Sequence, residues 1–89
     1  MPTVIIPALL RKHTGGVDRV QVVGNSLGGL IVNLDKRFPG IASQLLQDGD
    51  LRPSIAVSID GEMATYGLLE RVGESSEVHF LPAIGGGRN

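Results

Sequence analysis

The sequence predicts a small α+β domain in which one amphipathic helix packs on a mixed β-sheet. Apolar residues recur at three- and four-residue spacing over residues 27–38, which indicates one main helix. Short β-branched or alternating runs lie on both sides of it, at residues 3–6, 17–23, 55–59 and 77–81. A chain of 89 residues has room for one modest core, and its hydrophobic fraction of 42% is typical of a packed domain.

The N-terminal part predicts a β-hairpin. Residues 3–6 form the first strand, Pro7 ends it, and Leu9 and Leu10 return to the core. The polar, Gly-rich residues 11–16 are expected to form the hairpin loop. The second strand covers residues 17–23 and alternates, with Val20 and Val22 on one face and Arg19 and Gln21 on the other.

The main helix begins after a residue suited to cap it. Ser26 is the preferred N-cap and Asn25 the alternative, because either side chain can accept a hydrogen bond from a free backbone N–H. Gly28 and Gly29 each cost about 1 kcal/mol of helix stability relative to Ala. They indicate either close packing of the helix on a strand or the approach of a partner's backbone. The predicted apolar face is Leu27, Leu30, Ile31, Leu34 and Phe38, and Pro39-Gly40 ends the helix.

The C-terminal half predicts the rest of the sheet. Residues 41–46 form one further helical turn and residues 47–50 a loop. Residues 55–59 are nearly all apolar, as in a strand deep in a sheet, and Asp60-Gly61 is a turn before an edge strand at residues 62–65. A hairpin, a crossover helix and a final strand inside the sheet make the β-grasp arrangement, although periodicity alone does not select it over other small α+β folds.

The chain ends in a segment that no core can hold. Pro82 lacks an N–H, so strand pairing is expected to stop there, and three consecutive glycines, Gly85 to Gly87, follow. The sequence therefore predicts a globular domain over residues 1–84 and a flexible, exposed tail over residues 85–89. Many Gly-rich C-termini are only frayed ends, and that alternative stays open.

Composition excludes several classes of function. A net charge of −1 gives no reason to expect nucleic acid or an anionic membrane as partner. The chain has no Cys, no signal peptide pattern and no membrane-spanning run, so the cytoplasm is the expected compartment. His13 and His79 lack the spacing of metal ligands and are interpreted as surface residues, so no bound metal or cofactor is expected. No catalytic motif is present, which favours a protein substrate or carrier over an enzyme.

These features together resemble the prokaryotic ubiquitin-like sulfur carrier proteins, with the carriers of cysteine biosynthesis as the nearest likeness. That group includes the small subunit of molybdopterin synthase and the thiamin-pathway carrier. The resemblance covers essentially the whole chain and implies a β-grasp fold. Its motifs are Ile6-Pro7-Ala8-Leu9-Leu10-Arg11, His13-Thr14-Gly15-Gly16, Gly24-Asn25-Ser26-Leu27 and Phe80-Leu81-Pro82-Ala83-Ile84-Gly85-Gly86-Gly87.

The resemblance also implies a chemistry for the tail. A ubiquitin-activating-type enzyme would adenylate the terminal glycine, Gly87, with Mg-ATP, and a sulfur source would convert the adenylate to a thiocarboxylate. A sulfur-accepting synthase would then take the sulfur. Pro82, Ile84, Gly85 and Gly86 would thread into these partners, since residues 82–87 reach roughly 20 Å when extended. The docking surface is expected on the sheet face near the tail.

The sequence departs from the family pattern at its end. Members of the family act with a C-terminal Gly-Gly, whereas Arg88-Asn89 follows Gly87 here. The resemblance implies that a JAMM-type zinc metalloprotease cleaves between Gly87 and Arg88, and that the uncleaved chain is inactive. A terminus one residue earlier, at Gly85-Gly86, is the alternative.

Three functions remain open at this point. The first is a sulfur carrier for cysteine or a related sulfur metabolite, with methionine, thiamin and molybdopterin as other pathways. The second is a ubiquitin-like modifier joined to lysines through the same glycine. The third is a β-grasp interaction module with an inert tail.

Overall fold

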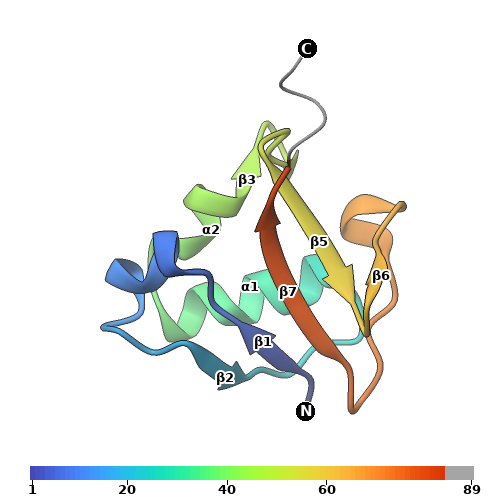
Figure 1. The fold of residues 1–89 in the computed structure, drawn as a ribbon, viewed down its shortest axis with the longest axis horizontal. Helices are drawn as coiled ribbons and strands as arrows, with labels where there is room; N and C mark the ends of the chain where they lie inside the picture. The colour runs from blue at the N-terminus through green and yellow to red at the C-terminus, as the bar shows by residue number, and fades with distance from the viewer. Residues whose placement is uncertain (84–89) are drawn as a thin grey trace.

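Strand β7 (Glu77–Pro82) lies in the middle of the sheet, between β1 (Thr3–Ile5) and β5 (Ile55–Ile59). The computed structural model describes residues 1–83, and Figure 1 shows the sheet with its helices. The predicted boundary between domain and tail, at residues 84 and 85, lies outside the described residues. The other elements are η1 (Ala8–His13), β2 (Arg19–Gln21), α1 (Leu27–Arg37), α2 (Ile41–Leu45), β3 (Leu46–Gln47), β4 (Asp50–Leu51), β6 (Glu62–Met63) and η2 (Gly67–Leu69).

The five-stranded sheet has the order β2-β1-β7-β5-β6. β1 pairs antiparallel with β2 and parallel with β7, whereas β7 pairs antiparallel with β5. The sheet is therefore mixed and its final strand is internal, as the sequence predicts. A hairpin followed by a crossover helix and an internal last strand is the β-grasp topology.

One side of the sheet forms the core beneath α1 (Figure 1). Alternate residues of the strands point to this side and are buried, including Val4, Val57 and Phe80. The helix contributes four of its five predicted apolar residues to the core, and the fifth, Phe38, is half-buried. The buried apolar residues are Val4, Ile6, Leu10, Val20, Val22, Leu27, Leu30, Ile31, Leu34, Ile41, Leu45, Val57, Val72, Val78 and Phe80.

Ser26 is the N-cap of α1, as predicted, and its hydroxyl oxygen accepts from the backbone N–H of Gly29 at 3.1 Å. The predicted close packing at Gly28 is present, but a strand is not the neighbour. A Cβ on Gly28 would lie 3.3 Å from the carbonyl oxygen of Leu68, in η2. The helix ends before Gly40, whose φ of 102° suits glycine.

Several expected boundaries are wrong. The second strand covers only Arg19–Gln21, and the expected hairpin loop begins with the 3-10 helix η1, which contains His13. The loop at residues 47–50 is part of the small β3–β4 hairpin, in which Leu46 pairs with Leu51. Short strands with polar residues carry little periodic signal, which explains these errors. Within residues 1–83, no helix has the length and apolar content needed to cross a membrane.

Among the glycines of residues 1–83, Gly24 has the least space around it, and this generates a first prediction. An added Cβ would lie 2.8 Å from Cα and 2.9 Å from the backbone nitrogen of Leu30, and the helix backbone cannot yield locally. We expect Gly24→Ala to lower the free energy of unfolding by about 1–3 kcal/mol, as overpacking does. Urea denaturation followed by circular dichroism measures this.

The matched control is Gly29→Ala, at which the added Cβ meets only the Ser26 hydroxyl at 3.3 Å. Because alanine favours a helix by about 1 kcal/mol over glycine, this variant should be as stable as the wild type or more so. Equal stability of Gly24→Ala and the wild type would contradict the packing described here.

Candidate functional site

The pairing of β7 with β5 continues to the last described residue. Pro82 pairs with Ile55, and the N–H of Ala83 donates to the carbonyl of Ser54 at 2.9 Å. The prediction that pairing stops at Pro82 is therefore wrong. The chain that leads to the predicted tail starts from a fixed point on the sheet.

The alternation of an antiparallel ladder explains why Pro82 is tolerated. The N–H of Asp60 donates to Glu77 and that of Ala83 donates to Ser54, so odd-numbered residues of β7 face β5. The nitrogen of Pro82 consequently faces the β1 side, where the last pair is Ile5 with His79. At this position the missing N–H removes no ladder hydrogen bond.

An exposed apolar groove of about 530 Å³ lies beside the end of β7. We call it the tail-base groove, and it is formed by η1, the start of β5 and the end of β7. Leu9 is 73% exposed and Leu81 is 38% exposed, so apolar surface is available to a partner there. The lining residues are Pro7, Ala8, Leu9, Leu10, Ser54, Ile55, Phe80, Leu81, Pro82 and Ala83.

The 3-10 helix η1 presents Leu9 outward. Leu10 is buried in the core, and its N–H donates to the carbonyl of Pro7 at 2.9 Å. The Nε of Arg11 donates to the carbonyl of Ile6 at 3.2 Å and closes the turn. Leu10 faces inward whereas its neighbour Leu9 is exposed, so the prediction that Leu9 lies in the core is wrong. Its exposure instead extends the tail-base groove.

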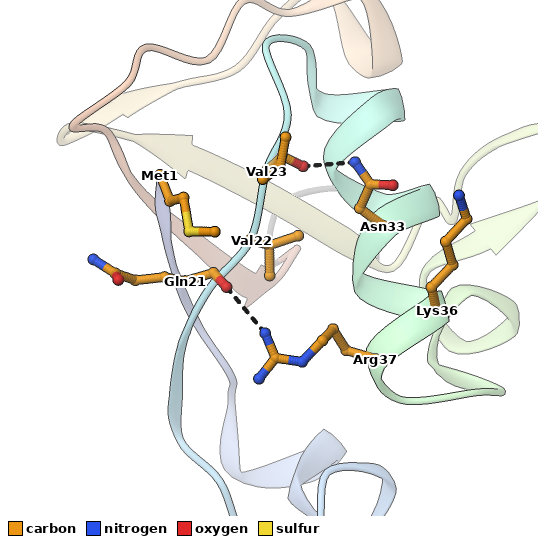
Figure 2. Close-up of a pocket in the computed structure, with 7 residues that line it drawn as sticks. All are labelled: Met1, Gln21, Val22, Val23, Asn33, Lys36 and Arg37. Carbon is orange, nitrogen blue, oxygen red and sulfur yellow. Dashed lines mark hydrogen bonds between the residues drawn. The ribbon is translucent and has the colours of Figure 1, made fainter.

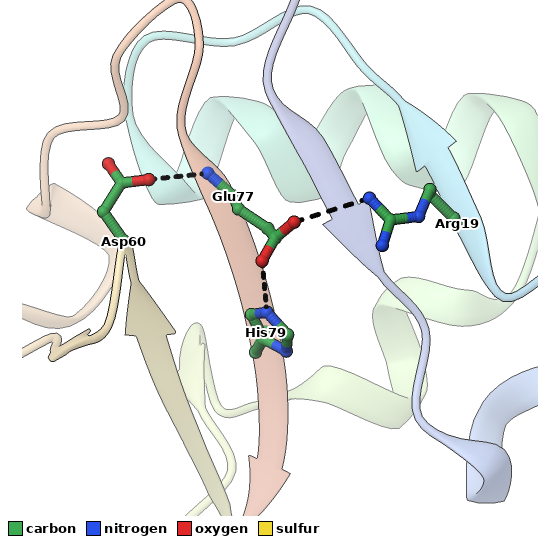
Figure 3. A network of polar contacts seen from close by, with 4 residues as sticks. All are labelled: Arg19, Asp60, Glu77 and His79. Carbon is green, nitrogen blue, oxygen red and sulfur yellow. Dashed lines mark hydrogen bonds and ion pairs between the residues drawn. The ribbon is translucent and has the colours of Figure 1, made fainter.

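The opposite end of β7 carries a polar network on the open face of the sheet (Figure 3). Glu77 lies 2.9 Å from Nε2 of His79 and 3.4 Å from Nη1 of Arg19. The backbone N–H of Glu77 donates to Oδ1 of Asp60 at 2.9 Å, and the Ser76 hydroxyl donates to Oδ2 at 2.8 Å. These contacts join the start of β7 to β2 and to the β5–β6 turn.

The network lowers the pKa of two carboxyl groups. The backbone N–H of Glu77, with the Ser76 hydroxyl, holds the pKa of Asp60 below its ordinary value. The imidazole of His79 is the main cause of the lowered pKa of Glu77. Both carboxylates are exposed, so their contribution to stability is screened by solvent.

The two histidines differ in their surroundings. His79 is partly exposed and pairs with Glu77, a contact between residues two apart on one strand face. His13 departs from the expected surface position, because its Nε2 is buried and has no hydrogen-bond partner among residues 1–83. In the described part of the chain, no three His, Asp or Glu side chains are grouped to hold a metal ion.

Of the predicted site residues, the structure places Pro82 on the sheet beside the tail-base groove. The others, Ile84, Gly85, Gly86, Gly87 and Arg88, lie outside the described residues. Sequence reasoning missed Leu9 as an exposed groove residue. The only signal for it was the pair Leu9-Leu10, in which a tight turn buries one member and exposes the other.

The topology and the groove at the end of the last strand define a ubiquitin-like domain. The chain belongs to the ThiS family, whose model matches residues 4–87. Sulfur carrier proteins of this kind are small carriers and are not enzymes themselves.

Known proteins agree with this assignment over nearly the full length. The chain is 33% identical to the sulfur carrier protein CysO of Mycobacterium tuberculosis, over 96% of this chain and 97% of the relative. Its structure matches the Amycolatopsis orientalis BexX/CysO complex with a TM-score of 0.90 at 32% identity, covering 98% of this chain and 100% of the other. It also matches SAMP1 of Haloferax volcanii with a TM-score of 0.72 at 29% identity, covering 97% and 98% of the two chains.

The lowered pKa of Asp60 generates a second prediction, which concerns stability in acid. A carboxyl group whose pKa is lower in the folded than in the unfolded state stabilises the fold above its unfolded pKa of about 4, and this contribution is lost as the pH falls through the folded value. We expect Asp60→Asn to be less stable than the wild type at pH 6. The two unfolding free energies should converge towards pH 3.

Asp48→Asn is the matched control, because Asp48 and Asp60 both precede glycine and have φ values of 55° and 53°. Asparagine tolerates this positive φ, so the two substitutions have the same effect on backbone strain. Urea unfolding from pH 3 to pH 6 measures the effect. A constant gap between Asp60→Asn and the wild type across this range would contradict the prediction.

Proposed function

We propose that this protein is a sulfur carrier whose C-terminal glycine, Gly87, is activated as an acyl adenylate and converted to a thiocarboxylate. The sulfur then passes to a biosynthetic enzyme that makes cysteine or a related sulfur metabolite. The family match that ends at Gly87, on a chain whose last strand ends beside an exposed apolar groove, is the observation that carries this proposal.

The proposed chemistry requires only the terminal carboxylate from this chain. A carboxylate oxygen attacks the α-phosphorus of ATP on the activating enzyme, and Mg-pyrophosphate leaves. A sulfur nucleophile then attacks the acyl carbon and AMP leaves, so one oxygen of Gly87 is replaced by sulfur. Glycines next to the reacting carbon let the chain enter a narrow channel, because no Cβ collides with its wall.

Processing belongs to the same proposal. Arg88-Asn89 follows Gly87, so the carboxylate of Gly87 is held in a peptide bond until that bond is cleaved. A JAMM-type zinc metalloprotease is the proposed agent, and Gly86 is the alternative terminus. Both the protease and the carrier are placed in the cytoplasm in this proposal.

The tail-base groove is the proposed contact for the activating enzyme and the sulfur-accepting synthase. Ala83 is hydrogen-bonded to the sheet, and four further residues reach Gly87. An extended chain of four residues spans about 14 Å, which delivers the terminus into a partner while the domain stays outside. Exposed Leu9 and Leu81 supply apolar area for that contact.

A ubiquitin-like modifier joined to lysines through Gly87 is the second candidate. The likeness to the small archaeal modifier protein SAMP1 at 29% identity favours it. Both candidates use the same activation and differ in the acceptor. Conjugates of higher mass in cells would support the modifier, whereas free thiocarboxylate would support the carrier.

Intact mass spectrometry tests the proposed function. After co-expression with the activating enzyme and the protease, we expect loss of Arg88-Asn89 and then a mass change equal to one oxygen exchanged for sulfur. A chain that ends at Gly87 should gain sulfur without the protease, which separates processing from activation. If full-length protein accepts sulfur, the processing step is contradicted. If the Gly87-terminated chain gains no sulfur from an enzyme that is active on a known carrier, the carrier function is contradicted.

The role of the groove generates a further prediction. Leu9→Ser should raise the KM for adenylation about tenfold, since the loss of an apolar contact of about 1.4 kcal/mol weakens docking by that factor. The kcat should not change, because Leu9 belongs to the proposed docking contact and supplies no group to the reaction. ATP–pyrophosphate exchange with the Gly87-terminated chain measures both constants.

Leu69→Ser is the control, because Leu69 is 84% exposed and lies in η2, away from the tail-base groove. Its KM should equal that of the wild type. Equal KM values for the two leucine variants would exclude the groove as the docking surface.

A further inference from the structure

A second groove, of about 390 Å³, lies between the edge strand β2 and helix α1 (Figure 2). We call it the edge groove. Its lining includes Gln21 and Val23 from the strand side, and Asn33, Lys36 and Arg37 from the helix. None of these residues lines the tail-base groove, and the tail chemistry does not use them.

The backbone along one side of this groove is the free edge of the sheet. The N–H of Val22 donates to the carbonyl of Pro2, and the N–H of Ile6 donates to Asp18, so even-numbered residues of this segment face β1. The N–H and C=O groups of Gln21 and Val23 therefore point outward. An edge of this kind is a template for another strand.

Side chains of α1 cover the acceptors of this edge and leave its donors open. Arg37 Nη1 donates to the carbonyl of Gln21 at 3.3 Å, and Asn33 Nδ2 donates to that of Val23 at 2.8 Å. The N–H groups of Gln21 and Val23 donate to no group within residues 1–83. A carbonyl oxygen has two lone pairs, so each can still accept from an added strand.

The groove is also positively charged. Lys36 makes no ion pair within the described chain, and Arg37 is held by the Gln21 carbonyl and by the ring of Phe38, 5.7 Å from the guanidinium carbon. Asp35, the acidic residue next to Lys36, accepts from the N–H groups of Gly40 and Ala42 instead. The two cations are consequently available to carboxylates of a ligand.

Apolar surface completes the groove. Val23 is 58% exposed and Met1 is 52% exposed, and both border it. Open N–H donors, two cations and two apolar side chains suit an extended peptide with an apolar residue and neighbouring carboxylates. Two cations on a chain of net charge −1 do not suit a nucleic acid, whose binding depends on many phosphate contacts.

We propose that the edge groove binds an extended acidic peptide segment of a partner protein, which adds as a strand to β2. Its backbone carbonyls accept from the N–H groups of Gln21 and Val23, and its carboxylates contact Lys36 and Arg37. This is a second interaction surface, and a partner bound there leaves the C-terminal segment free to enter an enzyme.

The probe is a labelled peptide of two valines followed by three glutamates, and binding is followed by fluorescence anisotropy and by amide shifts in NMR spectra. We expect the shifts to concentrate at Gln21, Val23 and Arg37. Lys36→Gln with Arg37→Gln should weaken binding about fivefold, since it removes two exposed charge pairs that each contribute modestly to binding. Lys12→Gln with Arg71→Gln removes the same charge elsewhere and should change binding less than twofold.

Val23→Pro tests strand addition separately from charge. It removes one outward N–H and leaves the ladder with β1 intact, a position at which an edge strand tolerates proline. The variant should remain folded and lose peptide binding at least fivefold. The proposal would be overturned if Val23→Pro bound the peptide as well as the wild type, or if both charge variants lost binding equally. It would also be overturned if the folded wild type did not bind the peptide at millimolar concentration, or if it bound a single-stranded oligonucleotide equally well.

Discussion

The hydrogen bonding of β7 on both of its edges is the constraint on which the rest of the structure depends. β1 pairs with one edge in parallel and β5 pairs with the other in antiparallel orientation. This central position requires the chain to cross over between the N-terminal hairpin and β5, and α1 makes that crossing (Figure 1). Val78 and Phe80 then point towards the helix and join the core. The same strand carries the chain out of the domain, so the position of its end is fixed by the whole sheet.

The two ends of β7 have different chemical character. At its start, Asp60 and His79 hold Glu77 through its backbone and its side chain (Figure 3). At its end, exposed Leu9 and Leu81 border an apolar groove. Polar contacts hold the start of the strand, whereas the apolar surface at its end can be buried favourably against a partner. This division is consistent with a domain that presents its C-terminus to enzymes, as proposed for the transfer of sulfur.

The sequence predicted those parts of the fold that have a periodic or capping signal. The helix, its Ser26 cap and the apolar strand β5 each have a periodic or capping signal, and the family resemblance is confirmed by the match over residues 4–87. Features that depend on a single contact were missed. The tolerance of Pro82 depends on which edge of β7 its nitrogen faces, and the exposure of Leu9 depends on the turn of η1. The hydrophobic pattern of the sequence predicts neither the orientation of the Pro82 nitrogen nor the exposure of Leu9. The predicted site at Gly87 lies outside the described residues and stays a prediction.

Amide hydrogen exchange at Ala83 tests most directly whether the sheet holds the chain up to the start of the C-terminal segment. The hydrogen bond from Ala83 to Ser54 predicts exchange slower than that of an unstructured peptide, on the order of a hundredfold, because the bond must open first. Protection of Leu81 should accompany it. Exchange of Ala83 at the unstructured rate, while Ser58 and Phe80 stay protected, would contradict the account, since the chain would then leave the sheet before the tail-base groove.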